Sequence, residues 1–335
     1  MSAAMRPASN APTGSAIASF AAALFLVAAS AGLLAALGNP YDGAPVVRVH
    51  VIGAPPPGGA AKSALAAPMA LAAHSVGALA PAPVAGLTAP GPGGLLPIIA
   101  RDGRASWKAY ARPFTDDGRP KIALVIGGLG LNVDQTQQAI TDLPPEITLA
   151  FSPYAENLQA QVDKARAAGH EVMIQIPMEP LDYPDTDPGP YTLTVNAQPV
   201  EISHRLEWLL SRATGYFGVT NMLGARFLGQ DKPMAVFSQA LRERGVAFID
   251  DGQAASRGGG LHRATAGPVI DAALDSGAID NQLLTLEANA LQTGGALGSG
   301  SAYPLTVAQV VRWSAAVRDR GYALAPASAL MALRP

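Results

Sequence analysis

The strongest constraint on the fold is an alternation of short β-rich runs with helical runs, which begins beyond Arg119 and is sustained to the end of the chain. Such alternation is typical of βα units and a largely parallel sheet. The expected strands are residues 122–126, 147–151, 171–176, 217–219, 246–249, 268–271, 296–299 and 322–325. The expected helices are residues 134–142, 157–168, 200–214, 234–244, 279–291 and 307–320. This pattern predicts an α/β fold, a distorted (β/α) barrel of seven or eight strands, with a doubly wound open sheet as the alternative.

Residues 1–118 are too biased in composition to pack a core with the rest. Residues 1–14 are predicted to be a short cytoplasmic segment. Residues 15–38 are uncharged and made of small and apolar residues, and about 20 such residues span a bilayer as a helix, so we expect a transmembrane anchor. The alternative is a cleaved signal peptide, because Ala29-Ser30-Ala31 is a pattern that a peptidase accepts.

The charges around the apolar run predict its orientation. Arg6 lies before the run and Asp42 after it, so the positive-inside rule predicts a single-pass inner-membrane protein with its bulk in the periplasm or outside the cell. Residues 39–118 are dominated by Ala, Pro and Gly and are predicted to form a disordered linker. This linker would be a spacer that lifts the globular domain, residues 119–335, off the membrane, or an insert without a role.

Composition and motifs exclude several classes of function. The formal net charge is −2 and 14% of the residues are charged, so no nucleic-acid partner is expected. The chain has no cysteine, which excludes disulfides and thiolate metal sites. The run Gly127-Gly128-Leu129-Gly130 lacks the third glycine of a dinucleotide loop, because Val133 stands at that offset. His170, His204 and His262 have no spacing that predicts a shared metal.

In a parallel α/β fold, the functional side chains lie at the carboxyl ends of the strands. Three of these ends carry Gly127-Gly128-Leu129-Gly130, Gln175-Ile176-Pro177-Met178-Glu179-Pro180 and Asn221-Met222-Leu223-Gly224-Ala225. Over roughly residues 119 to 335 the chain resembles the divergent polysaccharide deacetylase family, whose full motifs read Asp-Asp-x-Gly, His-x-Pro-Met-Glu-Pro and Asn-His-Met-Gly-Ser. The resemblance implies a deacetylase-type (β/α) barrel and metal-dependent hydrolysis of acetylated carbohydrate.

The positions where those motifs carry metal ligands hold other residues in this chain. Gly127 and Gly128 replace a pair of carboxylates, Gln175 replaces one imidazole and Met222 replaces the other. Glycine has no side chain, the glutamine amide is neutral, and a thioether is too soft for a hydrolytic metal. We therefore expect no cofactor, with a divalent metal held by relocated acidic residues as the alternative.

The candidate catalytic residues are Asp250, Asp251 and Glu179. Asp250-Asp251 follows the expected strand 246–249 and matches an Asp that the family carries at this strand end. Paired carboxylates can divide acid and base roles, and the alternative is that one caps a helix while the other faces solvent. Glu179 lies in a rigid proline-flanked turn, and a buried Glu satisfied by backbone N–H groups is its alternative. These three residues and Asp271 would form the relocated metal site.

The candidate substrate-binding residues lie on or near the strand ends and are Gln175, Tyr183, Asn221, Arg226 and Asp271. Tyr183 belongs to a loop, residues 181–191, that is rich in Asp and Tyr. Carboxylates accept hydrogen bonds from sugar hydroxyls and tyrosine rings stack on sugar faces, so this loop predicts a glycan subsite. A calcium-stabilised or proline-stiffened lid is the alternative. Arg226 would pair with an acidic sugar or Asp250, or form a structural ion pair.

These observations predict a membrane-tethered protein that binds cell-envelope polysaccharide or a peptidoglycan-type glycan without the usual metal chemistry. Two alternatives remain: an active carbohydrate N- or O-deacetylase with relocated acidic ligands, and a non-enzymatic module that binds envelope proteins. Stoichiometric bound metal would favour the active deacetylase over the non-metal interpretation. Binding of a glycan would favour the glycan-binding protein over the module that binds envelope proteins.

Overall fold

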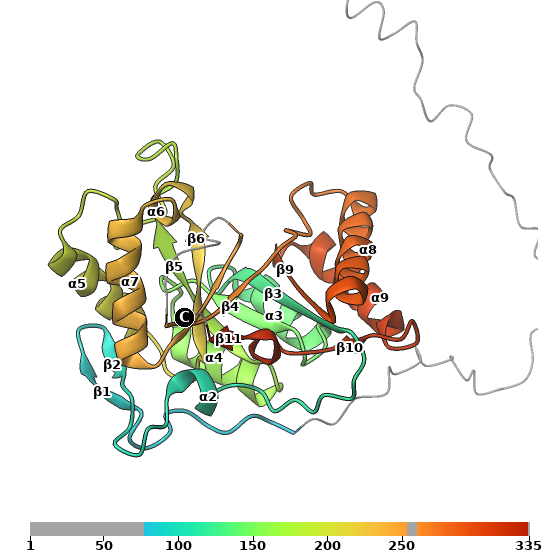
Figure 1. Ribbon diagram of the computed structural model, residues 1–335, viewed down its shortest axis with the longest axis horizontal. Coiled ribbons are helices and arrows are strands. Elements are labelled where there is room, and N and C mark those ends of the chain that lie inside the picture. The colour runs from blue at the N-terminus through green and yellow to red at the C-terminus, as the bar shows by residue number, and fades with distance from the viewer. Residues whose placement is uncertain (1–76, 253–259, 334–335) are drawn as a thin grey trace, which may run out of the picture. The chain divides into compact units, whose positions relative to one another are not determined.

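The computed structural model describes residues 77–252 and 260–333 (Figure 1). The predicted anchor, residues 15–38, and the first half of the predicted linker lie outside these residues. Within the described ranges, no helix combines the length and the apolar character that crossing a membrane requires.

A curled, mostly parallel sheet forms the centre of the fold. Its strands pair in the order β10-β3-β4-β5-β6-β7-β8-β11, and β9 pairs with β3. The strands are β3 (Lys121–Leu129), β4 (Thr148–Phe151), β5 (Val172–Met178), β6 (Gly218–Leu223), β7 (Ala247–Asp250), β8 (His262–Thr265), β9 (Gly295–Ser301), β10 (Ala323–Leu324) and β11 (Ala332–Leu333). Every pairing in the sheet is parallel except that of β11 with β8. The predicted α/β class and distorted (β/α) barrel are therefore confirmed.

The segment that follows β8 joins the two sides of the curled sheet. The Ala266 N–H donates to the carbonyl of Asp250 in β7 at 2.6 Å, whereas the Gly267 N–H donates to the carbonyl of Leu297 in β9 at 2.7 Å. The predicted strand 268–271 is wrong, because this stretch makes a single bridge, between Val269 and Ser299, and the strand itself lies earlier, at β8. This crossing segment replaces a regular eighth strand and distorts the barrel.

Helices cover the outside of the sheet, as Figure 1 shows. They are α3 (Val133–Asp142), α4 (Leu158–Ala167), α5 (Pro199–Leu210), α6 (Ala225–Leu228), α7 (Asp231–Arg244), α8 (Ser276–Thr293) and α9 (Pro304–Val317). Asn132 and Asp275 begin α3 and α8, because their side chains accept hydrogen bonds from the backbone N–H groups of Gln135 and Ala278. These caps fix where the loops at the strand ends turn into helices.

Alternation along each strand divides the core into an outer and an inner layer. In β3, Ile122, Leu124 and Ile126 belong to the outer cluster, which packs against the helices. Ala123 and Val125 belong to the inner cluster, which fills the barrel. Many inner positions on the other strands are also alanine, so the narrow interior is filled by small side chains.

An N-terminal strap, residues 77–112, packs against the end of the barrel where the strands begin. It holds β1 (Thr88–Gly91), β2 (Gly94–Pro97) and α2 (Ser106–Ala109), coloured cyan to teal along the lower edge of Figure 1. Leu87 is fully buried and Tyr110 is 2% exposed, and both join the inner cluster. Full burial of a leucine side chain stabilises a fold by about 1.5–3 kcal/mol. The predicted domain boundary at residue 119 is therefore too late, because this part of the predicted linker is folded.

A buried carboxylate ties the strap to the barrel. Glu171, just before β5, accepts hydrogen bonds from the Arg112 N–H at 3.0 Å, the Thr148 hydroxyl at 3.0 Å and the Ser328 N–H at 3.1 Å. Complete burial raises the pKa of Glu171, and these hydrogen bonds oppose the shift. The contacts join segments from both ends of the domain to β4 and β5.

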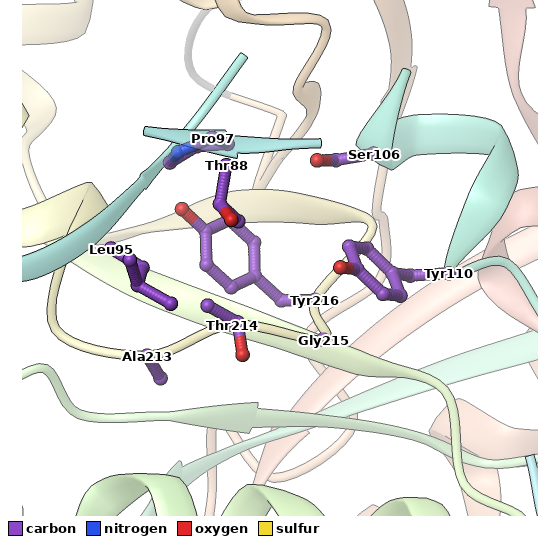
Figure 2. A pocket seen from close by; sticks show the side chains of 9 residues that line it. All are labelled: Thr88, Leu95, Pro97, Ser106, Tyr110, Ala213, Thr214, Gly215 and Tyr216. Atoms are coloured by element: carbon purple, nitrogen blue, oxygen red, sulfur yellow. The ribbon is translucent and has the colours of Figure 1, made fainter. Parts of the chain in front are cut away.

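Figure 2 shows the junction between the strap and the loop before β6. A cavity of about 10 Å³ lies there, near the lower limit for one water molecule. Its lining comes from the β1–β2 hairpin, α2 and the loop before β6: Thr88, Leu95, Pro97, Ser106, Tyr110, Ala213, Thr214, Gly215 and Tyr216. The Ser106 hydroxyl is buried here without a hydrogen-bond partner, whereas the Tyr216 hydroxyl donates to the carbonyl of Leu210 at 2.6 Å.

Candidate functional site

The sheet register brings the predicted site residues to one end of the barrel. Gln175 in β5 pairs with Thr220 in β6, and Thr220 pairs with Ile249 in β7. Asn221 and Asp250 each lie one residue further along their strands. The predicted residues on β5, β6 and β7 therefore share the face formed by the carboxyl ends of the strands.

The Gln175 side chain extends to the glycine pair at the end of β3. Its Oε1 accepts a hydrogen bond from the Gly128 N–H at 2.9 Å. A Cβ atom added to Gly127 would lie 2.9 Å from Gln175 Nε2, closer than real Cβ contacts allow. Gly128 adopts a φ of +76° beside an irregularity in the β3–β4 pairing. The amide thus lies in space that a side chain at Gly127 would need.

Both polar atoms of the Asn221 side chain form hydrogen bonds within the protein. Its Nδ2 donates to the carbonyl of Leu223 at 2.7 Å, and its Oδ1 accepts from the Asp251 N–H at 3.2 Å. Leu223 has a φ of +58°, which is rare for a residue other than glycine. Asn221 therefore shapes the end of β6 and the turn after β7, whereas Met222 beside it offers only a thioether.

Asp250 forms a buried ion pair. Its side chain is fully buried, and its Oδ2 accepts from Arg263 Nη2 at 2.6 Å, from Arg263 Nε at 3.0 Å and from the Thr265 hydroxyl at 3.1 Å. Its Oδ1 accepts from the Gly252 N–H at 2.9 Å. Asp251 next to it is partly exposed. The two carboxyl groups thus lie in different environments, and the guanidinium compensates the charge of the inner one.

Glu179 holds the loop after β5 against α6. Its Oε1 lies 3.1 Å from Arg226 Nη1, and its Oε2 accepts from the Val195 N–H at 2.7 Å. Its backbone carbonyl accepts from the N–H groups of Arg226 and Phe227 at 3.1 and 3.2 Å. The structure matches the alternatives stated for these residues, a buried Glu satisfied by a backbone N–H group and an Arg226 in a structural ion pair. The partner of Arg226 is Glu179, not Asp250.

Asp271 lies in the segment between β8 and α8 and connects it to the end of β9. Its Oδ2 accepts from the Ser301 N–H at 2.7 Å and from the Thr306 hydroxyl at 3.0 Å, and the residue is 9% exposed. A Cβ on Gly300 would lie 3.4 Å from its Oδ1. Asp271 therefore serves as a local tie at the start of α9.

The loop of residues 181–191 is anchored at its end and exposed in its middle. Tyr191 stacks on Trp208 with ring centroids 3.7 Å apart, and its N–H donates to the Tyr154 hydroxyl at 3.1 Å. Tyr183, in contrast, is half-buried, and Asp185 is exposed. Of the two aromatic residues in this loop, Tyr183 keeps more of its ring available for a ligand.

The side chains at this face do not fit a hydrolytic metal. Gln175 Oε1 is engaged with a backbone N–H, its amide fills the space beside Gly127, and the carboxylate of Asp250 is held by Arg263. Within the residues that the structure describes, no group of three or more His, Cys, Asp and Glu side chains converges on one point. A zinc-type site needs about three such ligands. The donors present are an amide, a thioether, the ion-paired carboxylates of Asp250 and Glu179 and the hydrogen-bonded carboxylate of Asp271, which are the wrong set.

Sequence analysis misses two residues that shape this face: Arg263, which reaches Asp250 from the start of β8, and Leu223, which ends β6. Arg263 is the partner of Asp250, and it lies in a four-residue strand, β8, that is too short for periodicity to predict. An arginine directly before the small residues Ala264-Thr265-Ala266 is the signal that could have indicated it. Leu223 carries an unusual backbone conformation, and the glycine that follows it in the motif was the available hint of a turn.

Comparison with known protein families assigns the chain to one family. The family described as divergent polysaccharide deacetylase matches residues 124–331, which is more than half of the chain. The chain therefore belongs to the divergent polysaccharide deacetylase family, and this membership indicates a carbohydrate-related function.

Three similar proteins are described as uncharacterized. An uncharacterized protein of Agrobacterium tumefaciens C58, known from a crystal structure, is 35% identical and superimposes with a TM-score of 0.68 over 71% of this chain and 99% of that one. An uncharacterized protein of Haemophilus influenzae is 25% identical over 130 residues, and the uncharacterized protein YibQ of Escherichia coli is 26% identical over 130 residues. These matches span 39% of this chain and 45% and 40% of the two curated relatives, less than half of their length.

Proposed function

We propose that this protein binds a cell-envelope glycan through the carboxyl-end face of its barrel and does not hydrolyse it with a metal. The observation that carries the proposal is the position of the Gln175 amide. Its Oε1 accepts a hydrogen bond from the Gly128 N–H, and the amide fills the space beside Gly127 where the family motif has a carboxylate. Family membership supports a carbohydrate ligand.

The loop of residues 181–191 supports a sugar subsite at this face. Tyr183 offers a partly exposed ring, and Asp182 and Asp185 are exposed carboxylates that can accept hydrogen bonds from hydroxyls. Asn221 and Asp271 support the backbone beneath this subsite. The Asn221 side chain donates a hydrogen bond to the Leu223 carbonyl, and the Asp271 side chain accepts one from the Ser301 N–H. Gln175 keeps its Nε2 group as a donor on the face itself.

We further propose that the protein is exported and held at the inner membrane by residues 15–38, with the barrel on the periplasmic side. The support for this step is the apolar run in the sequence and the charges that flank it. Fractionation of cells that express the full chain, with protease added to spheroplasts, tests both statements. Protection of the barrel from the protease would place it in the cytoplasm and reject the proposal.

Metal analysis tests the absence of metal-dependent hydrolysis. The full chain is incubated with Zn²⁺, dialysed and measured for bound metal, and a variant with Gly127→Asp, Gly128→Asp, Gln175→His and Met222→His serves as the matched comparison. We expect less than stoichiometric zinc on the natural chain and more on the variant. Stoichiometric zinc on the natural chain, together with release of acetate from an acetylated chitin oligomer, would establish the relocated-ligand alternative.

Glycan binding is tested by co-sedimentation of the full chain with insoluble peptidoglycan. Tyr183→Ala should weaken binding about tenfold, whereas Tyr183→Phe, which keeps the ring, should retain most of it. An equal loss in both variants would show that the ring does not stack on the ligand. Binding that neither variant changes would move the site away from this face.

A further inference from the structure

Six of the thirteen large apolar side chains that the described residues expose lie on the loops and strand ends at the carboxyl-end face of the barrel. We define the apolar rim as six of these side chains, with their exposed fractions: Leu131 (65%), Val133 (68%), Leu181 (74%), Leu223 (46%), Leu274 (54%) and Tyr303 (47%). Leu223 ends β6, and the others follow β3, β5 and β9 or precede α8. Because the strands are parallel, these loops surround one end of the barrel. Apolar side chains exposed on several loops of one face indicate an interaction site when one partner covers them together.

The backbone conformation of Leu223 supports a binding role for its exposed side chain. A leucine with a φ of +58° is strained, by an amount of about 1–3 kcal/mol in typical cases. The hydrogen bond from Asn221 Nδ2 to the carbonyl of Leu223 holds the conformation at 2.7 Å. A glycine here would relieve the strain, as Gly224 does at the next position with a φ of +103°. The chain instead keeps an apolar side chain exposed on a strained backbone.

The charge around the apolar rim is negative. Exposed carboxylates on the same loops and at the helix starts are Asp134, Glu156, Asp182, Asp185, Asp187 and Asp275. Among the described residues of these loops, the exposed basic side chains are Arg226, which pairs with Glu179, and Lys232, which adjoins Asp231. A surface on which apolar side chains and carboxylates lie side by side along the same loops is complementary to a partner with apolar and basic side chains.

The chemistry of the apolar rim favours a protein segment over a sugar. Five of its six side chains are aliphatic and one is a tyrosine, whereas sugar faces stack on aromatic rings. Aliphatic side chains gain free energy by burial against other apolar side chains. We propose that the apolar rim binds a segment of a partner protein that carries Leu-type and Lys- or Arg-type side chains. This interaction is additional to the proposed glycan site and does not depend on it.

The test uses the full chain and a short synthetic peptide of alternating Leu and Lys, measured by fluorescence anisotropy. Two matched peptides, of alternating Ser and Lys and of alternating Leu and Glu, separate the apolar from the charge contribution. We expect each matched peptide to bind at least about tenfold more weakly than the Leu–Lys peptide. Equal binding of the Leu–Lys and Ser–Lys peptides would overturn the proposal, because charge alone would then explain the affinity.

Matched variants locate the binding surface. Leu181→Ser and Leu131→Ser should each weaken binding of the Leu–Lys peptide, whereas Leu284→Ser and Leu291→Ser, at exposed positions of α8 outside the apolar rim, should leave it unchanged. Leu223→Gly removes the side chain and relieves the positive φ. It should therefore weaken binding while the midpoint of unfolding stays constant or rises, a combination that loss of folding cannot produce.

Two further results would reject the protein partner. If the rim variants weaken peptidoglycan binding as well as peptide binding, the apolar rim is part of the glycan site, and the proposed function stands while this inference fails. If sedimentation shows that the chain forms a dimer that Leu181→Ser disrupts, the occupant is a second copy of the chain. If instead Tyr183→Ala weakens glycan binding about tenfold and leaves peptide binding intact, the two sites are separate, as we infer.

Discussion

The contact between Gln175 and the Gly127–Gly128 pair predicts a strong coupling between two substitutions. In Gly127→Ala, the new methyl group would lie 2.9 Å from Gln175 Nε2, so the amide must move and release the Gly128 N–H. The lost hydrogen bond costs about 0.5–1.5 kcal/mol. Alanine in place of glycine within a strand gains about 0.5–1 kcal/mol. Gly127→Ala should therefore be close to neutral or slightly destabilising in the natural chain.

In a Gln175→Ala background the same substitution has nothing to displace. Gly127→Ala should then stabilise the fold by about 0.5–1 kcal/mol, because only the backbone gain is left. The coupling free energy between the two positions is expected to be about 1 kcal/mol. Urea denaturation of the four proteins, followed by circular dichroism, measures it. A coupling below about 0.3 kcal/mol would mean that the amide does not occupy this space, and the argument against a metal site would lose its main support.

Three further outcomes are expected from the buried polar groups. Ser106→Ala should leave the free energy of unfolding unchanged or raise it, because the hydroxyl is buried without a partner; a loss above about 1 kcal/mol in urea denaturation would contradict this. Arg263→Met should destabilise the fold by about 3–5 kcal/mol, since Asp250 would keep a buried uncompensated charge, and Asp250→Asn in the same chain should recover part of the loss by calorimetry. Burial lowers the pKa of His170 below its ordinary value of 6.5, so its contribution to stability is complete above pH 6.5 and is lost as the pH falls through the lowered pKa. The urea midpoint should therefore drop more between pH 7.5 and pH 5 in the natural chain than in His170→Gln, and equal drops would exclude His170 as the cause.

Hydrophobic periodicity was sufficient to predict most of the barrel. The run Ile122 to Ile126 alternates between two apolar layers, and both sides of such a strand are buried, so its type and place follow from the residues alone. The prediction for residues 77–112 is wrong, because it rests on amino-acid composition and not on hydrophobic periodicity. The strap is rich in Gly and Pro and was assigned to a disordered linker, although Leu87 and Tyr110 supply its buried anchors. Burial of a few large side chains outweighs the bias of the residues around them.

The site was predictable as a face but not as a set of contacts. Sequence position shows that Gln175, Asn221 and Asp250 end neighbouring strands, because parallel strands share one functional edge. It does not show that the Gln175 amide crosses to the end of β3, since β3 and β5 are separated by β4 in the sheet. Nor does it show Arg263 opposite Asp250, because that pairing depends on a short strand whose start the sequence leaves open.

Both ends of the described chain lie on the side of the barrel away from the apolar rim. The Leu79 N–H donates to the carbonyl of Arg166 at the last turn of α4, and β11 pairs with β8 at its first residues, His262 and Arg263. An affinity tag or fluorescent protein fused directly before residue 77 or directly after residue 333 would therefore emerge opposite the strand-end loops. A sensor chip that captures the protein by such a fusion would leave those loops facing the flow of analyte.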